Sequence, residues 1–131
     1  MLFRSLLRRN ASERAIAAKL AIHLAQGFPD HDVDVEYDRH GLAAKTLELP
    51  AECRGGGKRR VIPDIVIHHR GSDDENLVAI EIKKRSNKES RDYDRAKLVA
   101  MKSQLRYRVA VSLELPVGAE ITKNDVSVEW I

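Results

Sequence analysis

Length, composition and charge exclude several classes of protein. The chain has 131 residues, 43% of them hydrophobic and 33% charged, which predicts one globular domain, residues 1–131, rather than a disordered or fibrous chain. No apolar run approaches the roughly 20 residues of a membrane span, and a single cysteine, Cys53, leaves no disulfide framework or thiolate cluster. These features favour a cytoplasmic protein with no membrane partner.

The first half of the chain predicts a helix, a strand and a long loop. Apolar residues recur every four positions between residues 10 and 27, as on the buried side of an amphipathic helix. Residues 33–38 alternate apolar and polar side chains, as a half-buried strand does. Residues 39–60 are rich in glycine and favour a long loop, with a short strand near Leu47–Leu49.

The second half predicts a hairpin, a helix and two further strands. The β-branched segments 60–69 and 77–84 flank a polar connection that contains a glycine, which is typical of a hairpin. A helix is expected within residues 87–105, a strand over 107–115 and a short final strand over 127–131. The expected order is αβββαβ, with the final strand in addition, and it indicates an α/β fold.

Strand geometry brings charged side chains together on the predicted hairpin. Successive side chains of a strand point to opposite faces, so Glu81 and Lys83 share one face while Ile80 and Ile82 share the other. Asp64 lies on the partner strand, directly after a proline that donates no ladder hydrogen bond. We expect a local irregularity there that turns Asp64 toward Glu81.

Two carboxylates that converge from adjacent strands make a site of hard oxygen ligands. Such a site suits Mg²⁺ or Mn²⁺, with water and phosphate oxygens completing the coordination. A lysine beside the metal orients a coordinated water or helps to deprotonate it. Asp64, Glu81 and Lys83 are therefore the candidate catalytic residues of a phosphodiesterase.

The segments Pro63-Asp64 and Glu81-Ile82-Lys83 together resemble the motif of the PD-(D/E)xK, or restriction-endonuclease-like, nuclease superfamily. The resemblance is nearest in size and layout to Holliday junction resolvase-like and Mrr-like nuclease domains. It implies the αβββαβ core of that superfamily, a mixed central sheet flanked by helices. It also implies that Asp64, Glu81 and the main-chain carbonyl of Ile82 bind the metal, while Lys83 serves the attacking water.

Many members of the superfamily also place a glutamate near the metal from the first helix. Glu13 lies on the inward stripe of the first predicted helix, and the resemblance makes it a candidate fourth ligand. The alternative is a capping box, in which Asn10 caps the helix and Glu13 bonds back to its amide.

Basic residues near the motif are candidate nucleic-acid contacts. The net charge is only +3, but a mildly basic chain favours a polyanionic partner. For three of these residues, the run 58–60, a flexible surface loop is the alternative, and for Lys97 the alternative is a solvated helix face. The candidates are Lys58, Arg59, Arg60, Lys84 and Lys97.

His68 and His69 end the strand that carries Asp64. Because no soft ligands lie near them in the sequence, a solvated hairpin end is favoured over a metal site.

The sequence thus predicts a Mg²⁺- or Mn²⁺-dependent nuclease that hydrolyses DNA by in-line attack of water and acts as a homodimer. RNA stays open as a substrate. The alternatives are a non-catalytic nucleic-acid-binding protein with the same fold, and a protein-interaction subunit of a repair or defence assembly.

Overall fold

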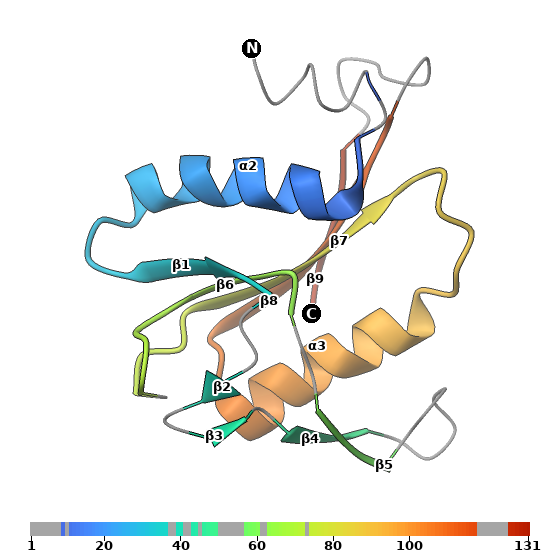
Figure 1. Ribbon diagram of the computed structural model, residues 1–131. Coiled ribbons are helices and arrows are strands. Elements are labelled where there is room, and N and C mark those ends of the chain that lie inside the picture. Colours follow the sequence, from blue (N-terminus) through green and yellow to red (C-terminus); the bar gives the residue numbers. More distant parts are fainter. Residues whose placement is uncertain are drawn as a thin grey trace.

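A five-stranded mixed sheet lies between two helices, with α2 on one face and α3 on the other (Figure 1). The computed structural model describes residues 9, 11–36, 39–40, 43–44, 46–49, 57–60, 63–72, 74–117 and 126–131. The elements are α2 (Glu13–Gly27), β1 (Asp32–Val35), β2 (Arg39–His40), β3 (Ala43–Ala44), β4 (Thr46–Leu49), β5 (Gly57–Arg60), β6 (Ile65–His68), β7 (Val78–Lys84), α3 (Asp92–Leu105), β8 (Val109–Leu115) and β9 (Ser127–Trp130). The mixed α/β class is as predicted. Within the described residues, neither helix is long and apolar enough to cross a membrane.

The sheet has the strand order β1-β6-β7-β8-β9. The predicted hairpin is confirmed, because β6 and β7 pair antiparallel. The chain then crosses over through α3, so that β8 pairs parallel with β7, as a helical connection between parallel strands allows. The expected final strand is confirmed as β9, which pairs antiparallel with β8 at the edge of the sheet.

The alternation of side chains along the strands divides the core in two. On the α2 face, Ile65, Ile80 and Ile82 are buried together with residues of the helix. On the α3 face, Val66 and Ala79 belong to a second buried cluster, which includes residues of α3. Each central strand is therefore anchored from both sides, and this holds the start of β6 against β7.

The first strand ends earlier than expected. β1 covers Asp32–Val35 rather than residues 33–38, because Glu36 has a φ of 54° and a left-handed residue does not continue a strand. The main-chain N–H of Glu36 instead donates to the carbonyl oxygen of Asp64, at 3.0 Å. Residues 37–38 lie outside the described part of the chain.

The prediction of a long loop over residues 39–60 is wrong for the part of this segment that the structure describes, residues 39–40, 43–44, 46–49 and 57–60, which lie in short strands. The predicted strand near Leu47–Leu49 is present as β4, but it pairs antiparallel with β5, and β2 pairs with β3. Leu47 and Leu49 are buried in the α3-side core. This tertiary burial orders a segment whose glycine content favours a loop.

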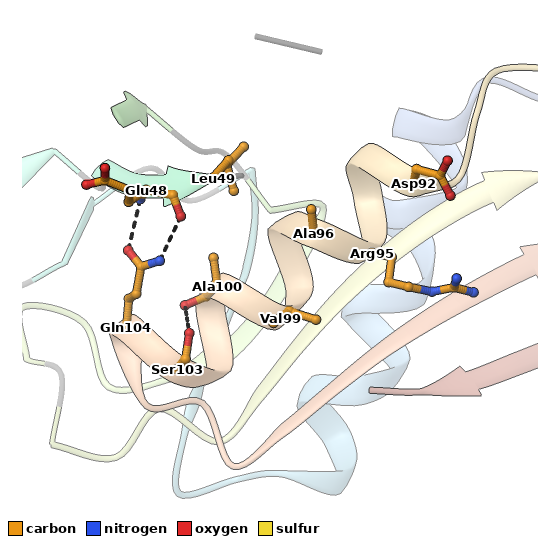
Figure 2. A pocket seen from close by; sticks show the side chains of 9 residues that line it. All are labelled: Glu48, Leu49, Asp92, Arg95, Ala96, Val99, Ala100, Ser103 and Gln104. Atoms are coloured by element: carbon orange, nitrogen blue, oxygen red, sulfur yellow. Dashed lines mark hydrogen bonds between the residues drawn. The ribbon is translucent and has the colours of Figure 1, made fainter. Parts of the chain in front are cut away.

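A side chain of α3 holds β4 in place (Figure 2). Gln104 accepts a hydrogen bond from the main-chain N–H of Glu48 at 2.9 Å and donates one to its carbonyl at 2.8 Å. A groove of about 530 Å³ lies between β4 and this side of α3, and Leu49 and Val99 line part of it. The amide of Gln104 thus gives β4 a hydrogen-bonding partner on the helix.

The edge strand β9 exposes large apolar side chains. Val128 is 47% exposed and Trp130 is 71% exposed. The end of the strand is nevertheless attached, because the main-chain N–H of Ile131 donates to the carbonyl of Ala110 and Lys102 Nζ donates to the carbonyl of Ile131.

Candidate active site

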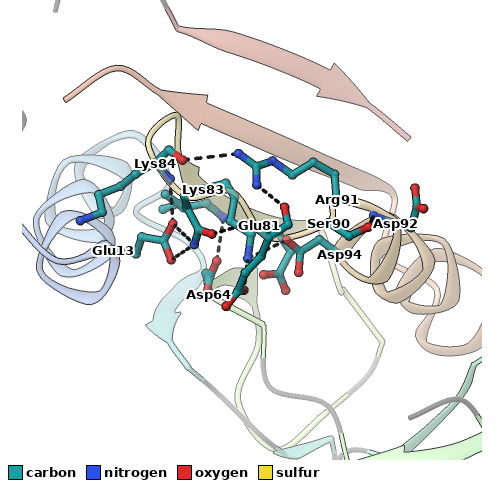
Figure 3. Close-up of polar contacts among 12 residues, drawn as sticks. Glu13, Asp64, Glu81, Lys83, Lys84, Ser90, Arg91, Asp92 and Asp94 are labelled. Carbon is teal, nitrogen blue, oxygen red and sulfur yellow. Dashed lines mark hydrogen bonds and ion pairs between the residues drawn. The ribbon is translucent and has the colours of Figure 1, made fainter. Parts of the chain in front are cut away.

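Asp64 and Glu81 face each other at the start of strand β6. Asp64 sits in a bend directly before β6, and the pairing of Ile65 with Ile80 places Asp64 opposite Glu81. The Oδ2 atom of Asp64 accepts a hydrogen bond from the main-chain N–H of Ile82 at 2.6 Å. The expected irregularity before β6 therefore turns the aspartate toward β7 (Figure 3).

β7 extends past the start of β6, so its main chain needs other partners on that edge. The carboxylate of Asp64 accepts a hydrogen bond from the main-chain N–H of Ile82. The carboxylate of Glu13 accepts one from the main-chain N–H of Lys84, with 2.7 Å between Glu13 Oε2 and Lys84 N. In an antiparallel pair, the N–H and the C=O of one residue point to the same side. The carbonyl of Ile82 therefore faces the edge at which Asp64 and Glu13 lie.

Glu13 reaches this edge from the first turn of α2. The capping-box alternative is wrong, because Ser12 is the N-cap and its Oγ accepts from the N–H of Ala15 at 3.1 Å. The carboxylate of Glu13 instead receives the N–H of Lys84 and, at 3.3 Å, Nδ2 of Asn87. The inward direction expected for Glu13 is confirmed.

Glu81 is the most deeply buried carboxylate of the site, at 4% exposure. Burial raises the pKa of Glu81 well above its usual range, and Asp64 raises it further through repulsion and a shared hydrogen bond, while Lys97 opposes these effects. Lys97 Nζ lies 2.7 Å from Oε1 of Glu81. This contact is an ion pair without an aligned hydrogen bond, and Oε1 has no such bond within the described residues.

Lys97 points into the protein rather than onto a solvated face of α3. It is 8% exposed, so the alternative of a solvated helix face is wrong. The same burial argues against Lys97 as a nucleic-acid contact, because its ammonium faces Glu81. Its Nζ also lies 5.5 Å from the centre of the Tyr93 ring. Burial acts to lower the pKa of Lys97, but Glu81, Asp64 and Asp94 together raise it above its usual value, which keeps the ammonium charged.

Lys83 lies on the same face as Glu81 and pairs with residues that sequence reasoning missed. Its Nζ is 3.1 Å from Oδ2 of Asp94 and 3.5 Å from Oε2 of Glu89. Burial acts to lower the pKa of Lys83, but Asp94, Glu13 and Glu89 raise it above its usual value. The signal for Asp94 was available, because it stands three residues before Lys97 and four before Leu98 on one side of α3.

The remaining basic candidates lie on two strands, β7 and β5. Lys84 is half-buried, and its side chain extends away from Asp64 and Glu81 (Figure 3). Lys58, Arg59 and Arg60 belong to β5, opposite Glu48, Leu47 and Thr46 respectively. The flexible-loop alternative is therefore wrong for this run, and its side chains lie outside the described part of the structure.

The other end of β6 carries a second polar cluster. His68 is 2% exposed, so the expectation of a solvated hairpin end is wrong for it. Its Nε2 lies 2.8 Å from Oδ2 of Asp34, and Arg70 Nη2 lies 2.6 Å from Oδ1 of the same carboxylate. Burial acts to raise the pKa of Asp34, but Arg70 and His68 together bring it below the usual value.

The start of β6 gathers oxygen donors, although among the described residues Asp64, Glu81 and Glu13 do not form a group with one ligand atom each within 4.8 Å of the others. The donor set combines the carboxylates of Asp64 and Glu81 with the edge of β7 on which the Ile82 carbonyl lies, and Glu13 is adjacent. Oxygen donors of this kind suit Mg²⁺ or Mn²⁺. Oε1 of Glu81 already lies 2.7 Å from the ammonium of Lys97, so a metal ion bound to this oxygen would have to displace or share that contact.

Comparisons of the chain with family models, with curated proteins and with solved structures find no match.

Proposed function

We propose that the protein is a metal-dependent nuclease of the PD-(D/E)xK type that hydrolyses phosphodiester bonds of DNA. One observation carries the proposal. The carboxyl groups of Asp64 and Glu81 interact on one face of the sheet. Burial raises the pKa of Glu81, and the neighbouring Asp64 raises it further. Lys97 neutralises one of the two carboxylates, and the second negative charge beside Glu81 disfavours its ionisation. This excess of carboxylate oxygens supports a role in binding a cation.

In this proposal Asp64, Glu81 and the carbonyl of Ile82 hold Mg²⁺ or Mn²⁺, with Glu13 as a further ligand or as the residue that fixes the edge of β7. The bound cation supplies Lewis acidity and lowers the pKa of a coordinated water. The main-chain N–H of Ile82 keeps Asp64 in position through the 2.6 Å hydrogen bond.

Lys83 acts as a charged hydrogen-bond donor. Two roles were open from the sequence, orientation of the attacking water and its deprotonation. Because Asp94 and other acidic neighbours raise the pKa of Lys83, the ammonium form is favoured. A protonated lysine orients water and stabilises negative charge on phosphorus oxygens, but it does not accept a proton.

The proposal includes a homodimer. β9 is an edge strand with the exposed side chains Val128 and Trp130. Edge strands with exposed apolar residues are surfaces that a second copy can cover by pairing.

A second candidate is a non-catalytic nucleic-acid-binding or protein-interaction subunit that keeps the nuclease fold. The contact between Lys97 and Glu81, at 2.7 Å, favours it, because an internal ammonium already neutralises the carboxylate that would bind the metal. The two candidates differ in whether Mg²⁺ displaces Lys97.

The test is cleavage of supercoiled, linear, single-stranded and branched DNA with Mg²⁺ or Mn²⁺. The wild type should cleave at least one substrate, and Asp64→Asn and Lys83→Ala should each reduce the rate by more than about 100-fold, since even outer-shell changes weaken metal sites by about 10–100-fold. Asp30→Asn is the matched control, because Asp30 is exposed beyond α2, and it should cleave like the wild type.

Equal cleavage by the wild type and Asp64→Asn would refute the proposed site. Absence of cleavage by the wild type, with DNA binding that weakens as salt rises, would support the non-catalytic candidate instead. Replacing DNA by single-stranded RNA of the same length decides between the two substrates.

A further inference from the structure

Two histidines and a glutamate converge at the end of β6 that lies away from Asp64. His31 sits in the turn between α2 and β1, while His69 and Glu75 flank the β6–β7 turn. One ligand atom from each residue lies within 4.8 Å of the other two. His69 Nε2 is 2.5 Å from Oε2 of Glu75, and His31 Nε2 is 3.9 Å from the same oxygen.

The backbone fixes this convergence. β1 pairs with β6 so that Asp32 stands opposite His68, and one further step along the antiparallel register places His31 opposite His69. Their rings stack with centroids 4.7 Å apart and 18° between the planes. The Phe28 ring lies edge-on to His31, with centroids 6.4 Å apart, so His31 has two ring neighbours.

The turn between the strands brings the carboxylate of Glu75 to a ring nitrogen of each histidine. The main-chain N–H of Ser72 donates to the carbonyl of His69, at 3.3 Å. Gly71 has a φ of 77°, a conformation that glycine adopts without strain. The chain thereby returns toward β7 and places Glu75 beside His69.

We propose that His31, His69 and Glu75 form a site for Zn²⁺. Two imidazole nitrogens and one carboxylate oxygen are a donor set that zinc accepts, with a fourth position left for water or another ligand. Mg²⁺ prefers oxygen donors alone, so this site and the Asp64–Glu81 site differ in the metal that they select.

To accept the ion, one imidazole ring must turn out of the His31–His69 stack, because nearly parallel rings do not direct both nitrogen lone pairs at one point. Zinc–ligand bonds of about 2.0–2.1 Å in a tetrahedral arrangement separate ligand atoms by roughly 3.4 Å. The distance from His31 Nε2 to the Glu75 oxygen, 3.9 Å, must shorten slightly, and the one from His69 must lengthen. A pocket of about 200 Å³ beside His31 and Glu75, lined also by Leu77 and Arg108, provides room for the fourth ligand.

Occupation of the site would join two segments distant in the chain. The turn after α2 and the β6–β7 turn would then share one ion, which stabilises the folded state because the unfolded chain does not hold the three ligands together. The competing explanation is a hydrogen-bonded His–Glu cluster without a metal.

The experiment is a calorimetric titration of the metal-free protein with Zn²⁺. The wild type should bind one equivalent with a Kd in the micromolar range or below, and bound Zn²⁺ should raise the unfolding midpoint. His69→Gln, His31→Gln and Glu75→Gln should each weaken binding by more than about 100-fold, since a lost ligand exceeds the effect of outer-shell changes. Circular dichroism of each variant verifies folding.

Two controls separate this site from other sources of binding. His23→Gln removes an exposed imidazole from α2 and should bind Zn²⁺ like the wild type. Asp64→Asn should also keep the one-equivalent binding, so that failure of the nuclease proposal and failure of the zinc proposal are distinguishable. The zinc site is refuted if the wild type binds no Zn²⁺, or if His69→Gln and His31→Gln bind it as tightly as the wild type.

Discussion

The two faces of strand β7 are buried under different helices and in different ways. Toward α2, Ile80 and Ile82 join an apolar cluster. Toward α3, Glu81 and Lys83 meet the charged side chains of Lys97 and Asp94. One strand thus carries an apolar face and a charged face, both covered by a helix.

The two faces differ in how burial contributes to the stability of the fold. Apolar burial is favourable for almost any well-shaped side chain. Buried ion pairs, in contrast, often contribute no more than apolar residues of similar volume, and they become strongly destabilising when one partner is lost. The charged face therefore depends on matched partners, which is the arrangement expected of a site with a chemical role.

Among substitutions on the two faces, Lys97→Met is expected to lower the free energy of unfolding most. The change leaves Glu81 buried without its ion pair, so the free energy of unfolding at neutral pH should fall by about 3–5 kcal/mol. Urea denaturation followed by circular dichroism measures the loss. In a Glu81→Gln background the same change should have a much smaller effect, and an equal loss in both backgrounds would show that the two residues are not coupled.

Denaturation of the wild type and Lys97→Met in the presence of Mg²⁺ tests whether Glu81 binds the cation. If Glu81 binds the cation, saturating Mg²⁺ should stabilise Lys97→Met more than the wild type, because no ammonium competes for the carboxylate. A shift in the unfolding midpoint that is the same for both proteins would count against Glu81 as a ligand.

The next largest effect is expected from Asp34→Asn, on the α3 face of the sheet at its other end. Asp34 accepts hydrogen bonds from Arg70 and pairs with the buried His68, and loss of its charge should lower the free energy of unfolding by about 2 kcal/mol.

The pH dependence of this loss follows from the direction of the shift. The pKa of Asp34 in the folded protein lies below its ordinary value of 3.8. Its contribution to stability is therefore complete above that value and disappears as the pH falls through the lower folded pKa. Denaturation curves of the wild type and Asp34→Asn should converge in acid, and a constant difference at every pH would contradict this account.

A smaller effect is expected on the apolar face, from Ile82→Val. Removal of one methylene from a buried side chain, here 3% exposed, should cost about 1 kcal/mol. DNA cleavage should stay at the wild-type rate, because only the main chain of Ile82 contributes to the site. A large loss of cleavage with little loss of stability would mean that the side chain itself positions the metal ligands.

The smallest effect on stability is expected from an exposed ion pair that lies outside the two buried faces of β7. Arg95 and Glu129 form an exposed ion pair between α3 and β9, and exposed pairs contribute little because water screens them. Arg95→Ala should leave the unfolding midpoint unchanged in thermal denaturation. A clear drop would show that β9 depends on this pair for its attachment.

Local patterns predicted one half of the site and missed the other. The period of two along a strand is enough to place Glu81 and Lys83 on one face, and Pro63 marks the irregularity that turns Asp64 inward. The sequence named Lys97 and its helical spacing could have pointed to Asp94, but their pairing with Glu81 and Lys83 depends on which turn of α3 crosses above β7. Packing between segments decides that pairing.

The strand pairs within residues 39–60 show the same limit. Glycine favours a loop in the unfolded chain, but Leu47 and Leu49 find a buried position against α3, and Gln104 supplies hydrogen bonds to the main chain of Glu48. Neither the burial against α3 nor the hydrogen bonds from Gln104 can be predicted from the sequence of residues 39–60 alone.

The exposed end of β9 has a consequence for spectroscopy. Trp130 is the single tryptophan of the chain, and with 71% of it exposed its emission should resemble that of a tryptophan in water while the protein is folded. Unfolding should change the signal little, whereas coverage of β9 by a second copy should shift the emission to shorter wavelength. Intrinsic fluorescence is thus a reporter of association at the sheet edge, observable by dilution of the unlabelled protein.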